Sequence, residues 1–286
     1  MTNAYGTNLS ERSESGRTRP TDGSRNELKI VTEKRGHVLC IALNRPAKYN
    51  AMDLDMYHQL AAAYGQLDAD PELRCGLVYG NGKHFTAGLE LDQWSKPFAT
   101  GAWPALTASE RDPFGLIPEK RVSKPLVFAV HGICFTVAIE LMLAADVRVA
   151  AEDCRFGQIE VKRGIYAVGG ATVRMVQEFG WGNAQKLLLT GDEFNAAEAL
   201  RIGLAQEVVP AGQQFERGLA IAERIAKQAP LGVYASLKNS RVSLEQNMLT
   251  AIQKMLPALA PIMQSADVAE GVKSFLERRE AKFQGK

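Results

Sequence analysis

Residues 124–150 read KPLVFAVHGICFTVAIELMLAADVRVA, and this stretch decides the fold that the sequence predicts. Leu126 to Val130 form a short apolar strand that ends at the turn His131-Gly132. The apolar stretch Ile133 to Ala145 predicts a helix, and Val147 to Ala150 predict the next strand. A strand, a helix and a second strand in this order indicate a βαβ unit with a right-handed crossover.

The same alternation continues on both sides of this stretch. Strands are predicted at 38–43 and 75–79, with a helix between them that includes residues 54–64. Residues 96–118 are rich in proline, glycine and aromatic residues and predict a long surface segment with one short helix. After residue 170 the pattern is mainly helical. It includes a helix start at Asn195 to Glu198, a strand at 205–209 and long amphipathic helices over 215–243 and 265–280.

Composition excludes several classes of protein. The chain has 286 residues, of which 46% are hydrophobic and 23% charged, and these values are typical of a globular protein. A net charge of +2 gives no general electrostatic case for binding nucleic acid. The four cysteines lie far apart without a C-x-x-C pair, so no metal site is predicted, and buried thiols in a reducing compartment are expected. Neither a membrane span nor a secretory signal is recognisable, so a cytoplasmic location is expected.

Two glutamates are candidates for acid–base chemistry. Glu140 lies inside an apolar stretch, where burying a carboxylate is costly without a partner or a raised pKa. Glu160 follows the sequence Phe156-Gly-Gln-Ile. Spacing alone is equally consistent with an outward-facing helix residue and an ion pair in a loop.

Backbone N–H groups provide a second candidate feature. In the segment His84-Phe-Thr-Ala-Gly-Leu-Glu-Leu91, a glycine after a strand allows N–H groups to turn towards a ligand, although an ordinary turn fits this piece equally well. The helix predicted over Ile133–Ala145 has unpaired N–H groups at its positive end. Together the two elements supply donors for an oxyanion hole.

In order and spacing, the sequence from Leu28 to the C-terminus resembles the crotonase superfamily, the enoyl-CoA hydratase/isomerase family. The matching segments are ALNRP (42–46) with Asn50-Ala51, FTAGLEL (85–91), the stretch from Lys124-Pro125 to His131-Gly132, DVRV (146–149), FGQIE (156–160), residues 195–210 and FLERREAKF (275–283).

The resemblance implies an α/β fold, a crotonase-like spiral of repeated ββα units with a mainly helical C-terminal trimerisation region. Beyond a tail at residues 1–26, which its composition predicts to be disordered, the resemblance implies a spiral core (27–210) and a helical region (211–286) for oligomerisation and covering CoA. Glu140 and Glu160 fall on the two acid/base positions of enoyl-CoA hydratases. Leu89 and Val137 fall on the oxyanion-hole donors. Trimers, or dimers of trimers, are implied as the assembly.

The implied function is syn-hydration of a 2-enoyl-CoA to a 3-hydroxyacyl-CoA, with CoA as part of the substrate and no separate cofactor. Open alternatives are double-bond isomerisation, thioester hydrolysis and a non-catalytic acyl-CoA-binding paralogue. Solvated surface is an equally good interpretation of Lys48, Lys282 and Phe283. The positions implied to contact substrate or CoA are Ala47, Lys48, Tyr49, Ala87, Glu90, Leu91, Ile133, Ile159, Lys282 and Phe283.

Three departures from the family pattern bear on specificity. Thr136, Val137 and Ala138 stand where the family usually has glycines, and the valine side chain is expected to narrow the acyl pocket or shift the helix start. Lys162-Arg163 replaces residues that are commonly apolar, which suggests a specialised substrate or a changed subunit contact. Val168 occupies the position of an additional aspartate in dienoyl-CoA isomerases, and this disfavours that activity.

Residues 1–26 contain almost no large apolar side chains, so they bury too little surface to offset the entropy lost on ordering. We expect this segment to exchange its amide hydrogens without protection, and its deletion to leave the fold intact. Hydrogen exchange followed by mass spectrometry measures this. Strong protection within the segment would contradict the prediction.

Overall fold

Strand β4 (Leu126–Val130) occupies the residues that the sequence predicts, and all of it is buried. It belongs to a six-stranded sheet in the order β1-β2-β3-β4-β6-β9, in which β1 and β2 are antiparallel and the other neighbours are parallel. Parallel strands that are covered on both faces are apolar throughout, as β4 is. The other strands of this sheet are β1 (Ile30–Arg35), β2 (Val38–Leu43), β3 (Cys75–Gly80), β6 (Val147–Ala151) and β9 (Glu207–Val209).

A second sheet contains the short strands β5 (Ile133–Phe135), β7 (Arg155–Gly157) and β8 (Glu193–Asn195), in that order. Along the chain, β4 is followed by β5 and then by helix α3 (Val137–Ala144). In the same way, β6 is followed by β7 and the 3-10 helix η3 (Glu160–Arg163). Each of these two turns therefore adds one strand to each sheet before a helix, which is the ββα unit of the predicted spiral.

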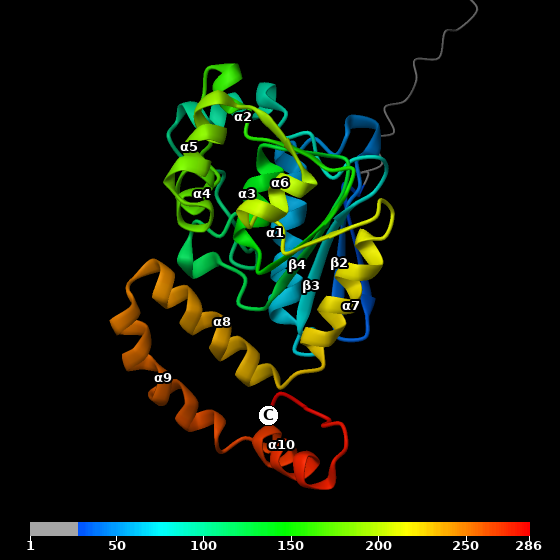
Figure 1. Ribbon diagram of the computed structural model, residues 1–286, viewed down its shortest axis with the longest axis vertical. Coiled ribbons are helices and arrows are strands. Elements are labelled where there is room, and N and C mark those ends of the chain that lie inside the picture. The colour runs from blue at the N-terminus through cyan, green and yellow to red at the C-terminus, as the bar shows by residue number, and fades with distance from the viewer. Residues whose placement is uncertain (1–27) are drawn as a thin grey trace, which may run out of the picture.

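The structure is a computed structural model that describes residues 28–286, so the expectation for residues 1–26 lies outside the described part (Figure 1). No helix in residues 28–286 is long and apolar enough to cross a membrane. The remaining helices are α1 (Leu54–Ala69), α2 (Leu91–Ala99), α4 (Ala171–Phe179), α5 (Trp181–Thr190), α6 (Ala196–Ile202), α7 (Gln214–Ala226), α8 (Pro230–Glu245), α9 (Met248–Ile262) and α10 (Ala266–Glu277), and the short 3-10 helices are η1 (Pro46–Lys48) and η2 (Pro118–Lys120).

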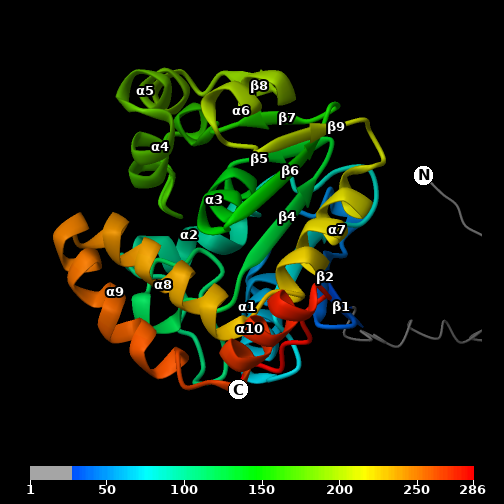
Figure 2. The ribbon, with the colours of Figure 1, turned by 60° about the horizontal axis from the view of Figure 1, so that its bottom comes forward.

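Helices cover both faces of the large sheet, and α7 and α3 lie on opposite sides of β4 (Figure 2). Because side chains alternate along a strand, Val127 and Ala129 contact the cluster under α7. Phe128 and Val130 contact the larger cluster that includes α1 and α3. The large cluster therefore connects the sheet to the helix that carries Glu140.

The C-terminal helices α8, α9 and α10 form an arm beside the core (Figure 1). The sequence analysis predicted one helix over 215–243, and this was wrong because the helix is interrupted between α7 and α8. Pro230 lacks an N–H group and forces the preceding Ala229 into an extended conformation, which ends α7 before this point. The helix predicted over 265–280 is confirmed as α10.

The segment between α2 and η2 is less exposed than predicted. Asp112 is buried and accepts hydrogen bonds from the backbone N–H groups of Phe114, Leu116 and Ile117. Trp103 contacts Phe114 with a ring-centroid distance of 4.8 Å. These contacts attach the segment to the core, so it forms a wall of the site described next.

Candidate active site

A cavity of about 180 Å³ lies between α3, the segment at residues 87–91 and η3. Seven of the residues implied by the sequence resemblance line this cavity. They are Ala87, Leu89, Leu91, Val137, Glu140, Ile159 and Glu160. The structure therefore brings together both candidate acid/base residues and both candidate N–H donors.

The loop that carries Leu89 is fixed against strand β5. Thr86 forms a parallel bridge with Cys134, and the Phe135 N–H donates to the Thr86 carbonyl at 3.1 Å. The prediction that the helix begins at Ile133 was wrong, because residues 133–135 pair with β7 as a strand. The helix begins at Val137 instead, so its first N–H group lies beside the loop.

Both candidate donors lack a protein acceptor within residues 28–286. The Met52 N–H donates to the Gly88 carbonyl at 2.8 Å, and the Glu90 N–H donates to the Met52 carbonyl at 3.1 Å. The N–H of the intervening Leu89 therefore points away from Met52. Val137 is the first residue of α3, and such a position has no intrahelical acceptor.

The turn before α3 has an unusual backbone conformation for a non-glycine residue. Thr136 has a φ of +51°, in a region that L residues rarely adopt. A Cβ on Gly88 would lie 2.4 Å from the Thr136 Oγ1, so the loop approaches the turn as closely as a glycine allows. The Val137 side chain is 1% exposed and packs into the core cluster, so the missing family glycines leave the backbone donor in place.

Glu140 is 3% exposed and accepts a hydrogen bond from the Ala171 N–H at 3.3 Å, at the start of α4. Burial, the larger cause, and the nearby negative charge of Glu160 together raise the pKa of Glu140 to about 8, although the N–H groups of Ala171 and Gly169 oppose the shift. A Cβ on Gly169 would lie 2.4 Å from the Glu140 Oε2. The carboxyl group is therefore enclosed by backbone.

Glu160 is 9% exposed and begins η3. Its Oε1 accepts a hydrogen bond from Gln158 Nε2 at 3.0 Å, while its buried Oε2 has no partner within residues 28–286. Burial raises the pKa of Glu160 to about 7. The alternative of an outward-facing residue and a loop ion pair is therefore wrong for both glutamates. An unpartnered carboxylate oxygen is instead available to a ligand.

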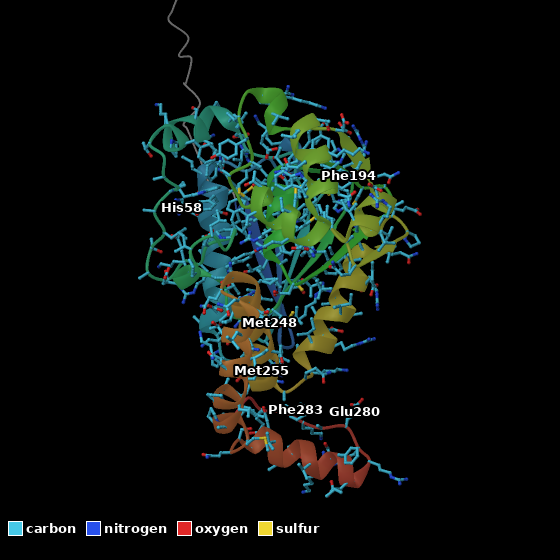
Figure 3. All side chains as sticks on the ribbon, turned by 60° about the vertical axis from the view of Figure 1, so that its left-hand side comes forward. His58, Phe194, Met248, Met255, Glu280 and Phe283 are labelled. Atoms are coloured by element: carbon cyan, nitrogen blue, oxygen red, sulfur yellow. The ribbon has the colours of Figure 1, made fainter. Side chains whose placement is uncertain are left out.

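Seven of the implied contacts do not line this cavity in the described chain: Ala47, Lys48, Tyr49, Glu90, Ile133, Lys282 and Phe283. Glu90 is held by Arg45, with an N–O distance of 2.9 Å, and lies 3.9 Å from the Lys48 Nζ. Phe283 lies against α8 on the C-terminal arm, as Figure 3 shows. These residues therefore lie outside the cavity that holds the two glutamates.

The sequence analysis did not identify the aromatic part of the wall. Phe98, Trp103 and Tyr166 line the cavity, together with Thr136, Arg163, Ile165 and Val168. Aromatic residues in the proline- and glycine-rich segment 96–118 were the available signal. Their position in the wall depends on packing against Trp94 and Phe114, which pattern alone does not specify.

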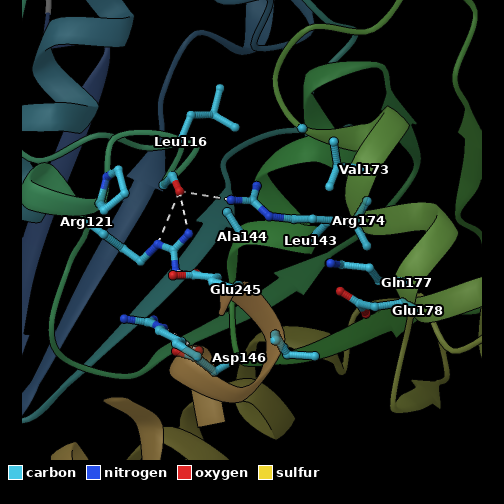
Figure 4. Close-up of a pocket in the computed structure, with 16 residues that line it drawn as sticks. Leu116, Arg121, Leu143, Ala144, Asp146, Val173, Arg174, Gln177, Glu178 and Glu245 are labelled. Atoms are coloured by element: carbon cyan, nitrogen blue, oxygen red, sulfur yellow. Dashed lines mark hydrogen bonds and ion pairs between the residues drawn. The ribbon is translucent and has the colours of Figure 1, made fainter. Parts of the chain in front are cut away.

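A larger cleft of about 510 Å³ lies between α4 and the end of α8, and its charged groups are already paired (Figure 4). Arg121 pairs with Glu245, and Arg241 pairs with Asp146 at 3.2 Å. Arg174 donates to the carbonyls of Phe114 and Gly115 at 2.7 and 3.0 Å. These contacts attach the C-terminal arm and the segment between α2 and η2 to the core. No cluster of three potential metal ligands occurs in the described residues.

Comparisons with known proteins identify the family of the chain. The model of the enoyl-CoA hydratase/isomerase family matches residues 33–286. Enoyl-CoA hydratase EchA19 of Mycobacterium tuberculosis is 35% identical over 263 residues, covering 90% of this chain and 96% of its own length. The mevalonyl-coenzyme A hydratase SIDH of Beauveria bassiana is 36% identical over 258 residues, covering 85% of this chain and 90% of its own.

The crystal structure of a probable enoyl-CoA hydratase/isomerase from Mycobacterium abscessus is also similar. It superposes with a TM-score of 0.87 at 42% identity, and the match covers 90% of this chain and 99% of that one. The two-sheet spiral that the two chains share defines a crotonase-type protein. The chain belongs to the enoyl-CoA hydratase/isomerase family.

The raised pKa values predict how stability changes with pH. Across the range between the ordinary glutamate pKa of 4.5 and about 8, folded Glu140 keeps a proton that the unfolded chain has released. Stability therefore falls as pH rises through this range. We expect Glu140→Gln to raise the melting temperature at pH 9 by at least about 2 °C, and to reduce its fall between pH 5 and pH 9. Calorimetry measures both.

The matched control is Glu216→Gln, because Glu216 is an exposed glutamate on α7 outside the cavity. This variant should keep the pH dependence of the parent protein. If Glu140→Gln also kept it, the carboxyl group of Glu140 would not be buried as described.

Proposed function

We propose that this chain catalyses syn-hydration of a 2-enoyl-CoA to a 3-hydroxyacyl-CoA. One observation carries the proposal: two buried carboxyls and two unpaired backbone N–H groups line the same cavity. The relatives named hydratases support the same reaction. The alternatives of isomerisation, thioester hydrolysis and binding without catalysis are outcomes of the test below.

The N–H groups of Leu89 and Val137 are proposed to bind the thioester oxygen. As water adds to C3 of the enoyl group, negative charge develops on this oxygen and an enolate forms. Fixed donors that need no reorganisation stabilise such charge more than they stabilise the neutral substrate. The buried, apolar surroundings of Val137 strengthen this interaction, because fewer water dipoles screen it.

Glu140 and Glu160 are proposed to transfer the protons. One carboxylate accepts a proton from the attacking water, and one carboxylic acid donates a proton to C2, so the pair returns to its starting charge overall. Raised pKa values of about 8 and about 7 keep a proton on the pair near neutral pH. A reaction that needs one acid and one base at the same pH requires this condition.

The chain itself supplies the acid, the base and the electrophilic donors in this proposal, and CoA enters as part of the substrate. No separate cofactor is therefore proposed. The four cysteines Cys40, Cys75, Cys134 and Cys154 are buried and free, as the sequence analysis predicted. Free thiols support the proposed cytoplasmic location, since disulfides persist mainly in oxidising compartments.

The glutamate pair provides the decisive test of the function. Glu140→Gln and Glu160→Gln should each lower the rate of crotonyl-CoA hydration at least about a hundredfold, because a positioned acid or base contributes about 10²–10⁴ in rate. The double variant should be little worse than either one, since the two groups act as a unit. Loss of the absorbance of the conjugated enoyl thioester measures hydration, because addition of water removes the C2–C3 double bond and leaves the thioester intact. Calorimetry should show little change in acyl-CoA affinity.

Glu216→Gln, outside the cavity, should hydrate crotonyl-CoA as the parent does. Normal hydration by Glu140→Gln combined with an inactive Glu160→Gln would favour a reaction in which Glu160 alone makes the proton transfers. If both variants matched the parent, the catalytic assignment would be wrong. Acyl-CoA binding by a parent protein that turns over no thioester would favour the non-catalytic alternative.

Assembly into a trimer, or a dimer of trimers, is proposed from the arm. Helix α9 exposes apolar side chains along its length, with Leu256 75% and Leu249 63% exposed in the single chain, and Figure 3 shows Met248 and Met255 on the same arm. An uncovered apolar surface of this kind is typical of an interface. The boundary between the spiral core and the helical region, at residues 210 and 211, remains a proposal. Helix α7, which follows this boundary, packs on the large sheet.

In such an assembly, the Lys282 and Phe283 segment lies outside its own cavity and is proposed to contact CoA bound by a neighbouring subunit. Sedimentation velocity at micromolar concentration should show a trimer or hexamer. Replacing Leu249 and Leu256 with glutamate should shift the protein towards monomer, because it buries charge in the interface. A parent protein that sediments only as a monomer would contradict the proposal.

A further inference from the structure

Arg163 is the one cationic side chain that lines the cavity among the described residues. It is the last residue of η3, which begins at Glu160. Side chains three residues apart eclipse one another on a 3-10 helix, so Arg163 and Glu160 project from the same side. Both residues line one cavity, in which Glu160 is buried and Arg163 is exposed, so Arg163 belongs to the solvent-facing end of the cavity.

Arg163 has no ion-pair partner in residues 28–286, although two carboxyls line the same cavity. The polar contacts of those carboxyls are with Gln158 and the Ala171 backbone. In the neighbouring cleft, by contrast, Arg121 and Arg241 are paired with acidic side chains. The charge of Arg163 is therefore available to a ligand.

The rest of this end of the cavity is apolar and open to solvent. Ile165 is 42% exposed, Tyr166 is 66% exposed, and Val168 completes the same edge. An anionic group on a substrate would be repelled by Glu140 and Glu160 unless a cation compensated it. A guanidinium matches a carboxylate in bidentate geometry, so Arg163 provides this compensation.

We propose that Arg163 binds a carboxylate at the distal end of the acyl chain, so that the preferred substrates are 2-enoyl-CoA thioesters of dicarboxylic acids. The inference rests on the proposed function and names the substrate class of the same site. A phosphate of CoA is the other anion that a guanidinium binds well. The acyl group is favoured because Arg163 shares the cavity with Glu160, whereas Lys48 and Lys282 lie outside it.

The test compares 2-hexenedioyl-CoA with 2-hexenoyl-CoA, which has the same chain length without the carboxylate. The parent protein should have a higher kcat/KM for the diacid thioester. Arg163→Leu should lower the ratio of the two kcat/KM values at least about tenfold, the effect of losing a charge-assisted hydrogen bond. Arg163→Lys should retain an intermediate ratio, since it keeps the charge without the bidentate geometry.

Lys162→Leu is the matched control. Lys162 is adjacent and exposed, but its side chain packs beside Gly191 and does not line the cavity. This variant makes the same change in charge and should leave the ratio unchanged. Equal losses on both thioesters in Arg163→Leu would assign the arginine to CoA phosphate and overturn the inference. An unchanged ratio with altered sedimentation would assign it to a subunit contact and also overturn it.

Binding of the saturated analogues separates this inference from the proposed function. Calorimetry should show that adipyl-CoA binds the parent more tightly than hexanoyl-CoA, and that Arg163→Leu removes the difference. If this preference were present but no enoyl-CoA were hydrated, the proposed function would fail and the inference would stand. If 2-hexenoyl-CoA were hydrated but no preference for the carboxylate appeared in rate or binding, the inference alone would fail.

Discussion

The arrangement of the site depends on the contact between Thr86 and Cys134. This bridge holds the loop containing Leu89 against β5, and β5 leads directly into the turn at Thr136 and the start of α3. Gly88 approaches the side chain of Thr136 so closely that a Cβ on Gly88 would lie 2.4 Å from the Thr136 Oγ1. The two unpaired N–H groups are therefore positioned by sheet pairing, which is more rigid than a free loop.

The same region determines the electrostatics. A helix that begins at Val137 directs Glu140, one turn later, into the space between α3 and the start of α4. Burial there raises the pKa of the carboxyl group, and the Ala171 N–H limits the shift. The N–H group at the start of α4 thus partly offsets the desolvation of Glu140, and pKa values of about 8 and about 7 allow one carboxyl to hold a proton while the other is ionised near neutral pH. Acid–base chemistry and charge stabilisation share one structural origin.

The departures from the family pattern affect the two ends of the cavity differently. At the N–H donors, three larger residues replace glycines, yet Val137 and Ala138 direct their side chains into the core, so the backbone geometry is retained. Thr136 adopts a positive φ, a conformation that costs free energy and that packing must support. At the other end, Arg163 places a charge where an apolar chain would otherwise meet solvent. The first set of changes therefore leaves the N–H donors of the proposed reaction in place, while the second, in the role proposed for Arg163, would alter what the cavity selects.

Local pattern was sufficient to predict the strands at 38–43, 75–79 and 126–130 and the helix start at Asn195, where the side chain accepts the Glu198 N–H at 3.0 Å. Apolar runs and caps are local signals. The strand at 133–135 was missed because its partners lie at residue 86 and at 155–157, far along the chain.

The sequence by itself indicated the family, the spiral fold and the two candidate glutamates through its resemblance to known members, because the order of several matching segments carries a signal that the spacing of two residues does not. Only the tertiary structure decided that both carboxyls are buried, that Trp103 and Tyr166 wall the cavity, and that Arg163 faces it without an acidic partner in the described residues. Burial and pairing depend on contacts between segments that are distant in sequence, and such contacts leave no periodic signal in the chain.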